Sequence, residues 1–92
     1  EEPHIMRRED GSWLVDGAVP IKELKEALQI ERFPREREGL YQTAGGLVMA
    51  CLEKVPATGD YFEWKDYRFE VVDMDGQRID KLLITLIKSN VD

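Results

Sequence analysis

The sequence has few of the side chains that usually carry catalysis. Its 92 residues include one cysteine, Cys51, and one histidine, His4. A single cysteine excludes an internal disulfide, and Cys51 falls in an apolar run far from His4, so we expect a small buried hydrophobic residue. Three of the serines and threonines fall in expected loops or helix caps, and no arrangement of nucleophile and base is evident. We therefore predict no catalytic residue and no enzymatic activity.

Basic residues are in the minority, and long apolar runs are missing. Thirteen Lys and Arg face nineteen Asp and Glu, which gives a formal net charge of −6 and a pI near 4.8. This sign argues against a nucleic acid that is bound through its phosphates and against an anionic membrane surface. No run of about 18 apolar residues occurs, so we expect no direct membrane insertion of this domain. One free cysteine fits a reducing, cytoplasmic compartment.

Length and composition predict one globular domain over residues 1–92, with a core at about 6–87. Apolar residues make up 42% and charged residues 35% of the chain. A chain of this size buries roughly 60–65% of its unfolded surface, enough for a modest core but not for a deep substrate cavity. The chain begins with Glu1 and not with Met, and we expect it to be excised from a longer protein.

The first half predicts a hairpin followed by a helix. Asp10-Gly11 lies between two extended segments, and Asp-Gly is a strong signal for a two-residue hairpin turn. The flanking strands are expected at His4–Glu9 and Ser12–Asp16. Pro20 is suited to open a helix, because its missing N–H has no partner at that position anyway. The apolar stripe of this helix is Ile21, Leu24, Ala27 and Leu28.

The stretch Thr43–Asp60 predicts a second short helix. Thr43 is a good N-cap, and Pro56 forbids continuation of a helix. One apolar stripe recurs at helical spacing between them, formed by Ala44, Leu47, Val48, Cys51, Leu52 and Val55.

The last third changes to a period of two and predicts three strands, Tyr61–Trp64, Tyr67–Asp75 and Gln77–Lys88. Asp75-Gly76 is a second hairpin signal. Because the final strand is apolar on both faces, we place it centrally in the sheet. The order β-β-α-α-β-β-β predicts an α+β fold, with two short helices packed on a mostly antiparallel sheet of about five strands.

The connection Gln29–Gln42 is dense in both charges and has no clear period. We expect an exposed loop, anchored by Phe33, Leu40 or Tyr41. Fourteen residues is long for a connection in so small a domain, which favours disorder or function there. Its arginines could hold a carboxylate or a phosphate, but glutamates are interleaved with them, so a solvated loop is the better interpretation. These residues are Arg32, Arg35 and Arg37, with Glu31, Glu36 and Glu38.

Two groups of residues are weak candidates for a binding site. Gly45-Gly46 stands at a helix start, where backbone amides can bind an anion. No Gly-Lys-Ser/Thr follows and no dinucleotide fingerprint surrounds the pair, so close packing of the helix is the favoured explanation. Asp73, Asp75 and Asp80 flank the second hairpin turn. They do not fit a calcium loop, because its first and last positions would fall on Val71 and Leu82.

Three motifs in order resemble a known family. The first is Asp10–Gly17, DGSWLVDG, and the second is Thr43–Val48, TAGGLV. The third runs from Pro56-x-x-Gly59-Asp60 through Phe69-Glu70-Val71 to Asp75-Gly76-x-Arg78-Ile79. Together they resemble the CorC/HlyC-type transporter-associated domain over nearly the whole chain, from about Met6 to Ile87.

The resemblance implies a fold like half of a PCMH-type FAD-binding domain and a place in a longer bacterial membrane protein, after a pair of CBS domains. Such proteins are associated with magnesium and cobalt efflux, and some are called haemolysins. The implied function is non-catalytic regulation of ion transport at the cytoplasmic face of the membrane, without a cofactor. The implied partners are the CBS and membrane domains of the same chain, or a second copy in a homodimer.

Two alternatives stay open. The first is a small-ligand sensor that binds a flavin or an adenine nucleotide in a groove at Gly45 and Gly46. The second is a divalent-metal sensor that uses Asp73, Asp75 and Asp80.

Overall fold

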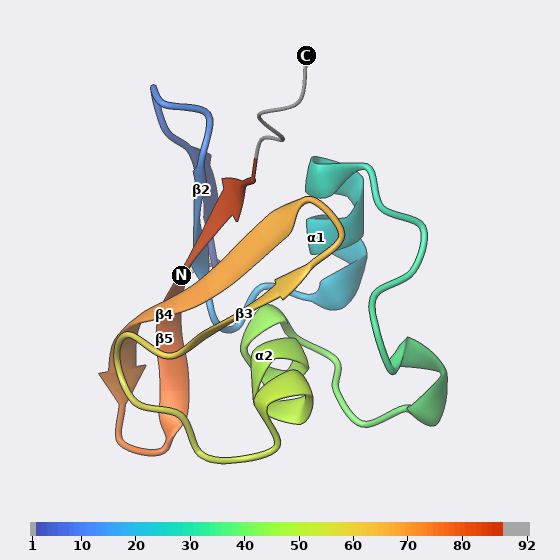
Figure 1. Cartoon of the computed structure of the whole chain (residues 1–92), viewed down its shortest axis with the longest axis vertical. Coiled ribbons are helices and arrows are strands. Elements are labelled where there is room, and N and C mark those ends of the chain that lie inside the picture. Colours follow the sequence, from blue (N-terminus) through green and yellow to red (C-terminus); the bar gives the residue numbers. More distant parts are fainter. Residues whose placement is uncertain (1, 88–92) are drawn as a thin grey trace.

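The computed structural model describes residues 2–87, and the predicted order of strands and helices is confirmed (Figure 1). One 3₁₀ turn, η1, is added in the long connection. The bounds are β1 Ile5–Arg7, β2 Trp13–Asp16, α1 Ile21–Leu28, η1 Glu36–Glu38, α2 Ala44–Leu52, β3 Tyr61–Trp64, β4 Tyr67–Asp75 and β5 Arg78–Leu86.

The five strands form one antiparallel sheet in the order β1-β2-β5-β4-β3. The last strand is central, as its apolar character on both faces predicts. Ile79, Leu82 and Ile84 of β5 are buried in the core, and Leu83 on the opposite face is half-buried. The β4–β5 register is irregular between Val71 and Met74, which bends the hairpin that carries Asp75-Gly76.

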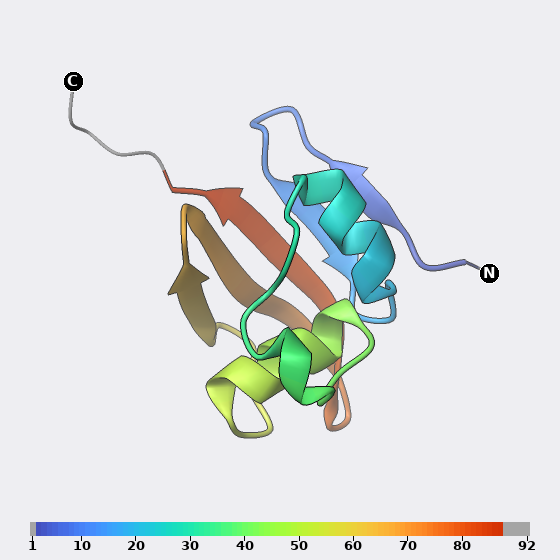
Figure 2. The same cartoon turned by 90° about the vertical axis from the view of Figure 1, so that its right-hand side faces the viewer.

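Both helices lie on one face of the sheet, and the other face is left open (Figures 1 and 2). This makes the α+β architecture with two helices on a five-stranded antiparallel sheet that the sequence predicts. The core fills the space between the two layers. Its fully buried side chains include Val15, Val19, Leu24, Leu47, Val48, Phe69, Val71, Leu82 and Ile84. No helix within residues 2–87 is long and apolar enough to cross a membrane.

Helix α2 begins where predicted and ends earlier than predicted. The Thr43 side-chain oxygen accepts a hydrogen bond from the Gly46 amide at 3.1 Å, which is the expected N-cap. The helix stops at Leu52 because Glu53 turns left-handed, with φ 59°. The prediction that the stripe continues to Val55 is wrong, since this side chain is 52% exposed. Val55 precedes Pro56, and a residue before proline disfavours the helical conformation.

The connection between the helices is exposed over more than half of its length, as predicted, and it is anchored to the core at two aromatic residues. Phe33 is only 2% exposed and lies 5.6 Å from Trp64 between ring centroids. The Tyr41 hydroxyl donates a hydrogen bond of 2.6 Å to the Pro34 carbonyl. Leu40 is 54% exposed and anchors nothing. Two of the three predicted anchors are therefore confirmed, because the rings of Phe33 and Tyr41 fill space beside α2 and β4.

Candidate functional site

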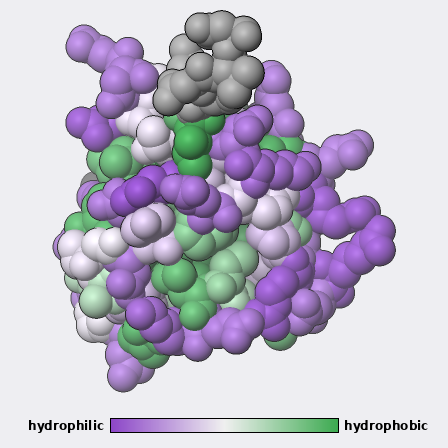
Figure 3. Space-filling model, in the orientation of Figure 1, coloured by the Kyte–Doolittle hydropathy of each residue, from purple (hydrophilic) through white to green (hydrophobic). Residues whose placement is uncertain are grey.

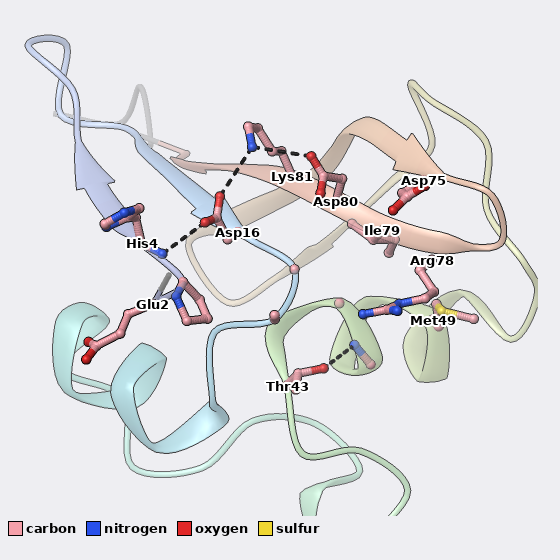
Figure 4. Close-up of a pocket in the computed structure, with 15 residues that line it drawn as sticks. Glu2, His4, Asp16, Thr43, Met49, Asp75, Arg78, Ile79, Asp80 and Lys81 are labelled. Atoms are coloured by element: carbon pink, nitrogen blue, oxygen red, sulfur yellow. Dashed lines mark hydrogen bonds and ion pairs between the residues drawn. The ribbon is translucent and has the colours of Figure 1, made fainter.

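A shallow hollow of about 550 Å³ lies between the end of β2, the start of α2 and the β4–β5 hairpin (Figure 4). It is where the first strand pair, the second helix and the last hairpin meet. Its lining combines carboxylates, two basic side chains and small residues, and these are Glu2, His4, Asp16, Gly17, Thr43, Gly45, Gly46, Met49, Asp75, Arg78, Asp80 and Lys81, with Pro3, Ala18 and Ile79.

The floor of the hollow is a junction of three backbones at Gly17. The Gly17 amide donates to the Asp80 carbonyl at 2.8 Å, and the Gly17 carbonyl accepts from the Gly45 amide at 2.9 Å. A Cβ on Gly17 would lie 1.9 Å from the Ile79 carbonyl oxygen, and one on Gly45 would lie 3.2 Å from the Gly17 carbonyl oxygen. The glycines therefore let α2 and β5 approach the end of β2 closely. In the sequence, Gly17 stands out only as the last residue of the motif Asp10–Gly17.

The amides at the start of α2 are already bonded within the chain. Those of Ala44 and Gly45 donate to the carbonyls of Val19 and Gly17, at 2.8 and 2.9 Å. The Gly46 amide donates to Thr43 Oγ1 at 3.1 Å. A Cβ on Gly46 would lie 2.9 Å from Cβ of Tyr41. Because an anion at a helix start needs free N–H groups, this geometry favours the packing explanation for Gly45-Gly46 over a phosphate cradle.

An ion-paired group forms the upper wall of the hollow (Figure 4). The Lys81 ammonium lies 3.4 Å from Asp16 Oδ1 and 3.3 Å from Asp80 Oδ2. The second oxygen of Asp16 accepts the His4 backbone N–H at 3.0 Å. That hydrogen bond, followed by the charge of Lys81, lowers the pKa of Asp16, while Asp80 and then Asp16 raise the pKa of Lys81. The group ties β1, β2 and β5 together, and its members are up to 65 residues apart in sequence.

The three aspartates proposed as metal ligands are not brought together as a set. Asp75 and Asp80 line the hollow, whereas Asp73 does not. Asp80 is engaged by Lys81, and Arg78 points from the hairpin toward α2 (Figure 4). Within residues 2–87 no group of three or more His, Cys, Asp or Glu is placed to hold a metal ion. A divalent cation at Asp75 and Asp80 would therefore keep most of its water ligands.

Arg35 is the one loop arginine that holds the connection to α2. Its Nη1 donates to the Ala50 carbonyl at 2.7 Å and lies 3.3 Å from Glu53 Oε2, and its Nη2 lies 3.0 Å from Glu38 Oε1. The arginine is thus used in structural contacts, in line with the solvated, charge-paired loop that the sequence favours over an anion site.

Cys51 is half-buried against the core, and burial raises the pKa of its thiol. The Arg35 charge opposes that shift but is the smaller effect. A thiol with a raised pKa is a weak nucleophile at neutral pH. This environment matches the expected small hydrophobic residue, although the side chain is less completely buried than predicted.

Comparisons with known proteins agree on one family. The family described as a transporter associated domain, CorC_HlyC, matches residues 6–88. A UPF0053 protein of Synechocystis is 55% identical over 84 residues, which are 91% of this chain and 19% of that protein. A polyamine export protein of Salmonella typhimurium is 46% identical over 92 residues, which are 98% of this chain and 20% of that protein. The chain thus spans about a fifth of the length of these relatives.

Solved structures agree with this match. A CorC_HlyC domain of a Xylella fastidiosa hemolysin, solved in complex with Mg²⁺ and Mn²⁺, superposes with a TM-score of 0.77 at 42% identity. The match covers 91% of this chain and 98% of that one. A CorC_HlyC domain from Haemophilus ducreyi gives a TM-score of 0.73 at 40% identity, over 85% and 99% of the two chains.

Proposed function

Because this chain belongs to the CorC/HlyC family of transporter-associated domains, we propose that it is a non-catalytic regulatory module of a larger membrane transport protein. In this proposal it lies on the cytoplasmic face of a bacterial membrane and acts by contact with the CBS and membrane domains of its own chain. The observation that carries the proposal is the match of nearly the whole chain to proteins of which it spans only a fifth, several of them named polyamine export proteins.

A cationic cargo fits the charge of the domain. The relatives named for a cargo export polyamines, which are linear chains of ammonium groups. A domain with a net charge of −6 attracts polycations and raises their concentration near its surface. We therefore propose export of an organic polycation, with magnesium or cobalt efflux as the alternative that the sequence motifs imply.

The test compares the full-length protein with a version lacking residues 1–92 in inside-out membrane vesicles. Uptake of labelled putrescine and spermidine, and of Mg²⁺ and Co²⁺, is followed over time. We expect polyamine uptake in both proteins, with a changed rate or concentration dependence after the deletion. If the vesicles take up only the divalent ions, the polyamine proposal is wrong and the alternative of magnesium or cobalt efflux is supported. Equal kinetics with and without the domain would contradict a regulatory role.

Metal binding by the domain itself is a second candidate, and the Xylella relative solved with Mg²⁺ and Mn²⁺ favours it. The residues to test are Asp75 and Asp80, which share the hollow. Calorimetric titration with Mg²⁺ and Mn²⁺ should give heat that is lost in the Asp75→Asn and Asp80→Asn variants, with Asp73→Asn as the matched control. Absence of heat at millimolar metal would remove this candidate.

A further inference from the structure

Helix α2 is apolar on every side, although only one side is covered. Its sequence, AGGLVMACL, contains no charged or hydrogen-bonding side chain, whereas α1, IKELKEAL, is clearly amphipathic. Helices that are apolar all round are normally buried. Yet Met49, Ala50, Cys51 and Leu52 are only half-buried. Figure 3 shows the resulting apolar patch over α2, next to β3.

Strand β3 next to this patch is a weakly protected sheet edge. It is the last strand of the sheet and runs along the outer margin of the molecule in Figure 2. Its sequence, YFEW, has no lysine, proline or bulge, and the protection that it has is limited to its short length of 4 residues and the charge of Glu63. The opposite edge, β1, is shorter and lies between Pro3 and Arg8. Of the two edges, β3 is the one suited to accept another strand.

We propose that β3 pairs antiparallel with β3 of a second copy of this chain about a two-fold axis perpendicular to the sheet. Side chains along β3 alternate, with Tyr61 and Glu63 exposed and Phe62 and Trp64 half-buried on the helix side. The two-fold axis must place the helix-bearing faces of the two sheets on the same side. It therefore passes between two copies of one residue, either Phe62 opposite Phe62 or Glu63 opposite Glu63. Centring on Glu63 places two carboxylates opposite each other, which is unfavourable. The register is therefore Phe62 opposite Phe62.

Charge complementarity supports the second copy as the partner. The Arg68 guanidinium lies 3.6 Å over the Tyr61 ring, and in its own chain it lies 3.6 Å from Glu70 Oε1 and 4.0 Å from Glu63 Oε2. In the Phe62 register, Tyr61 lies opposite Glu63 of the second copy. Each Arg68 is then shared between two Glu63 carboxylates, and the same pair forms twice about the axis. The axis also places both α2 helices on one face of the joint ten-stranded sheet, beside the shared edge.

Sedimentation equilibrium of the purified 92-residue chain tests the dimer, and charge variants test the surface. Glu63→Arg places arginines from both copies together and should weaken the dimer at least roughly tenfold. Combining Glu63→Arg with Arg68→Glu should restore it. Glu26→Arg on exposed α1 makes the same change in net charge and should leave association unchanged. Circular dichroism and Tm establish that each variant is folded.

Cross-linking tests the register. In a Cys51→Ala background, Tyr61→Cys and Glu63→Cys chains are mixed under mild oxidation. Residues directly opposite in antiparallel strands have Cα atoms about 4.5–5.5 Å apart, within reach of a disulfide. We expect a mixed dimer to exceed either homodimer by several-fold. A monomer at several hundred micromolar, a dimer that ignores Glu63→Arg, or cross-linking without preference for the mixed pair would each overturn the proposal. This inference does not depend on the transported cargo.

Discussion

Replacement of Gly17 by alanine is expected to destabilise the domain severely, because three backbones meet at this residue. Its φ lies outside the left-handed region, so alanine can adopt the backbone conformation and only the added methyl group matters. That Cβ would lie 1.9 Å from the Ile79 carbonyl oxygen and 2.9 Å from the carbonyl carbon. The oxygen contact must open to at least 3.0 Å, and no flexible side chain is there to give way.

The size of the effect follows from the bonds that the shift disturbs. Moving β2 away from β5 strains the 2.8 Å bond from the Gly17 amide to the Asp80 carbonyl, and moving it toward α2 strains the 2.9 Å bond from Gly45. One disturbed buried hydrogen bond costs about 1–3 kcal/mol, and overpacking costs a similar amount, so the total is about 2–6 kcal/mol. A domain of this length has only about 5–14 kcal/mol of stability.

Thermal unfolding followed by circular dichroism measures this prediction. Each 1 kcal/mol corresponds to about 4–8 °C in a domain of this size, so Gly17→Ala should lower Tm by roughly 8 °C or more. Gly39→Ala is the matched control, since nothing lies within 4 Å and only its φ of 70° adds strain, at about 1 kcal/mol. Gly45→Ala, whose Cβ would lie 3.2 Å from the Gly17 oxygen, should lose less stability than Gly17→Ala. The reasoning is refuted if Gly17→Ala unfolds no earlier than Gly39→Ala.

Three further outcomes follow from the structure. Phe33→Ala should cost about 3–5 kcal/mol in denaturant unfolding, whereas Leu40→Ala in the same loop should change stability by less than about 0.5 kcal/mol. Glu36→Gln should cost about 1 kcal/mol at pH 7, after allowance for solvent screening of a side chain that is 26% exposed. The hydrogen bond from Lys25, and then that from the Phe33 amide, lower the pKa of Glu36 in the folded chain. The contribution of Glu36 to the free energy of unfolding is therefore present above the ordinary pKa of 4.5 and is lost as the pH falls through the lower folded pKa. The unfolding curves of wild type and Glu36→Gln should then converge in acid. Because burial raises the pKa of Cys51, a thiol reagent at pH 7.5 should modify the folded chain far more slowly than the urea-unfolded chain, and equal rates would contradict its burial.

Local patterns in the sequence were sufficient for the elements and for the sheet order around the last strand. Both predicted hairpins form, and the glycines of the two Asp-Gly pairs take a positive φ, 90° at Gly11 and 63° at Gly76. The prediction of two-residue Asp-Gly turns is wrong, because the paired strands flank residues 8–12 in the first hairpin and residues 76–77 in the second. The apolar run of β5 fits only a strand that is covered on one face and flanked on both sides. The end of α2 was misjudged because Glu53 takes the left-handed conformation and ends the helix three residues before Pro56, whose own effect is limited to Val55.

The hollow could not be predicted in the same way, because its parts come from distant segments. Asp16 and Lys81 form an ion pair that cannot be predicted from their spacing along the chain. The loop between the helices was predicted to be exposed with an aromatic anchor, but only the fold shows that the Phe33 ring packs tilted against Trp64 and edge-on against Phe69.

The sequence by itself determined the family, the α+β class, the turns and the cap at Thr43, because each depends on a few neighbouring residues. Only the tertiary structure decided the role of the glycines. Gly17 and Gly45 lie where β5 and α2 pack closely against β2, and these contacts exist only after distant segments, such as Gly17 and Ile79, have come together. The same holds for the uncovered side of α2, which is apolar by sequence but is seen to lie beside an open sheet edge only in the folded domain.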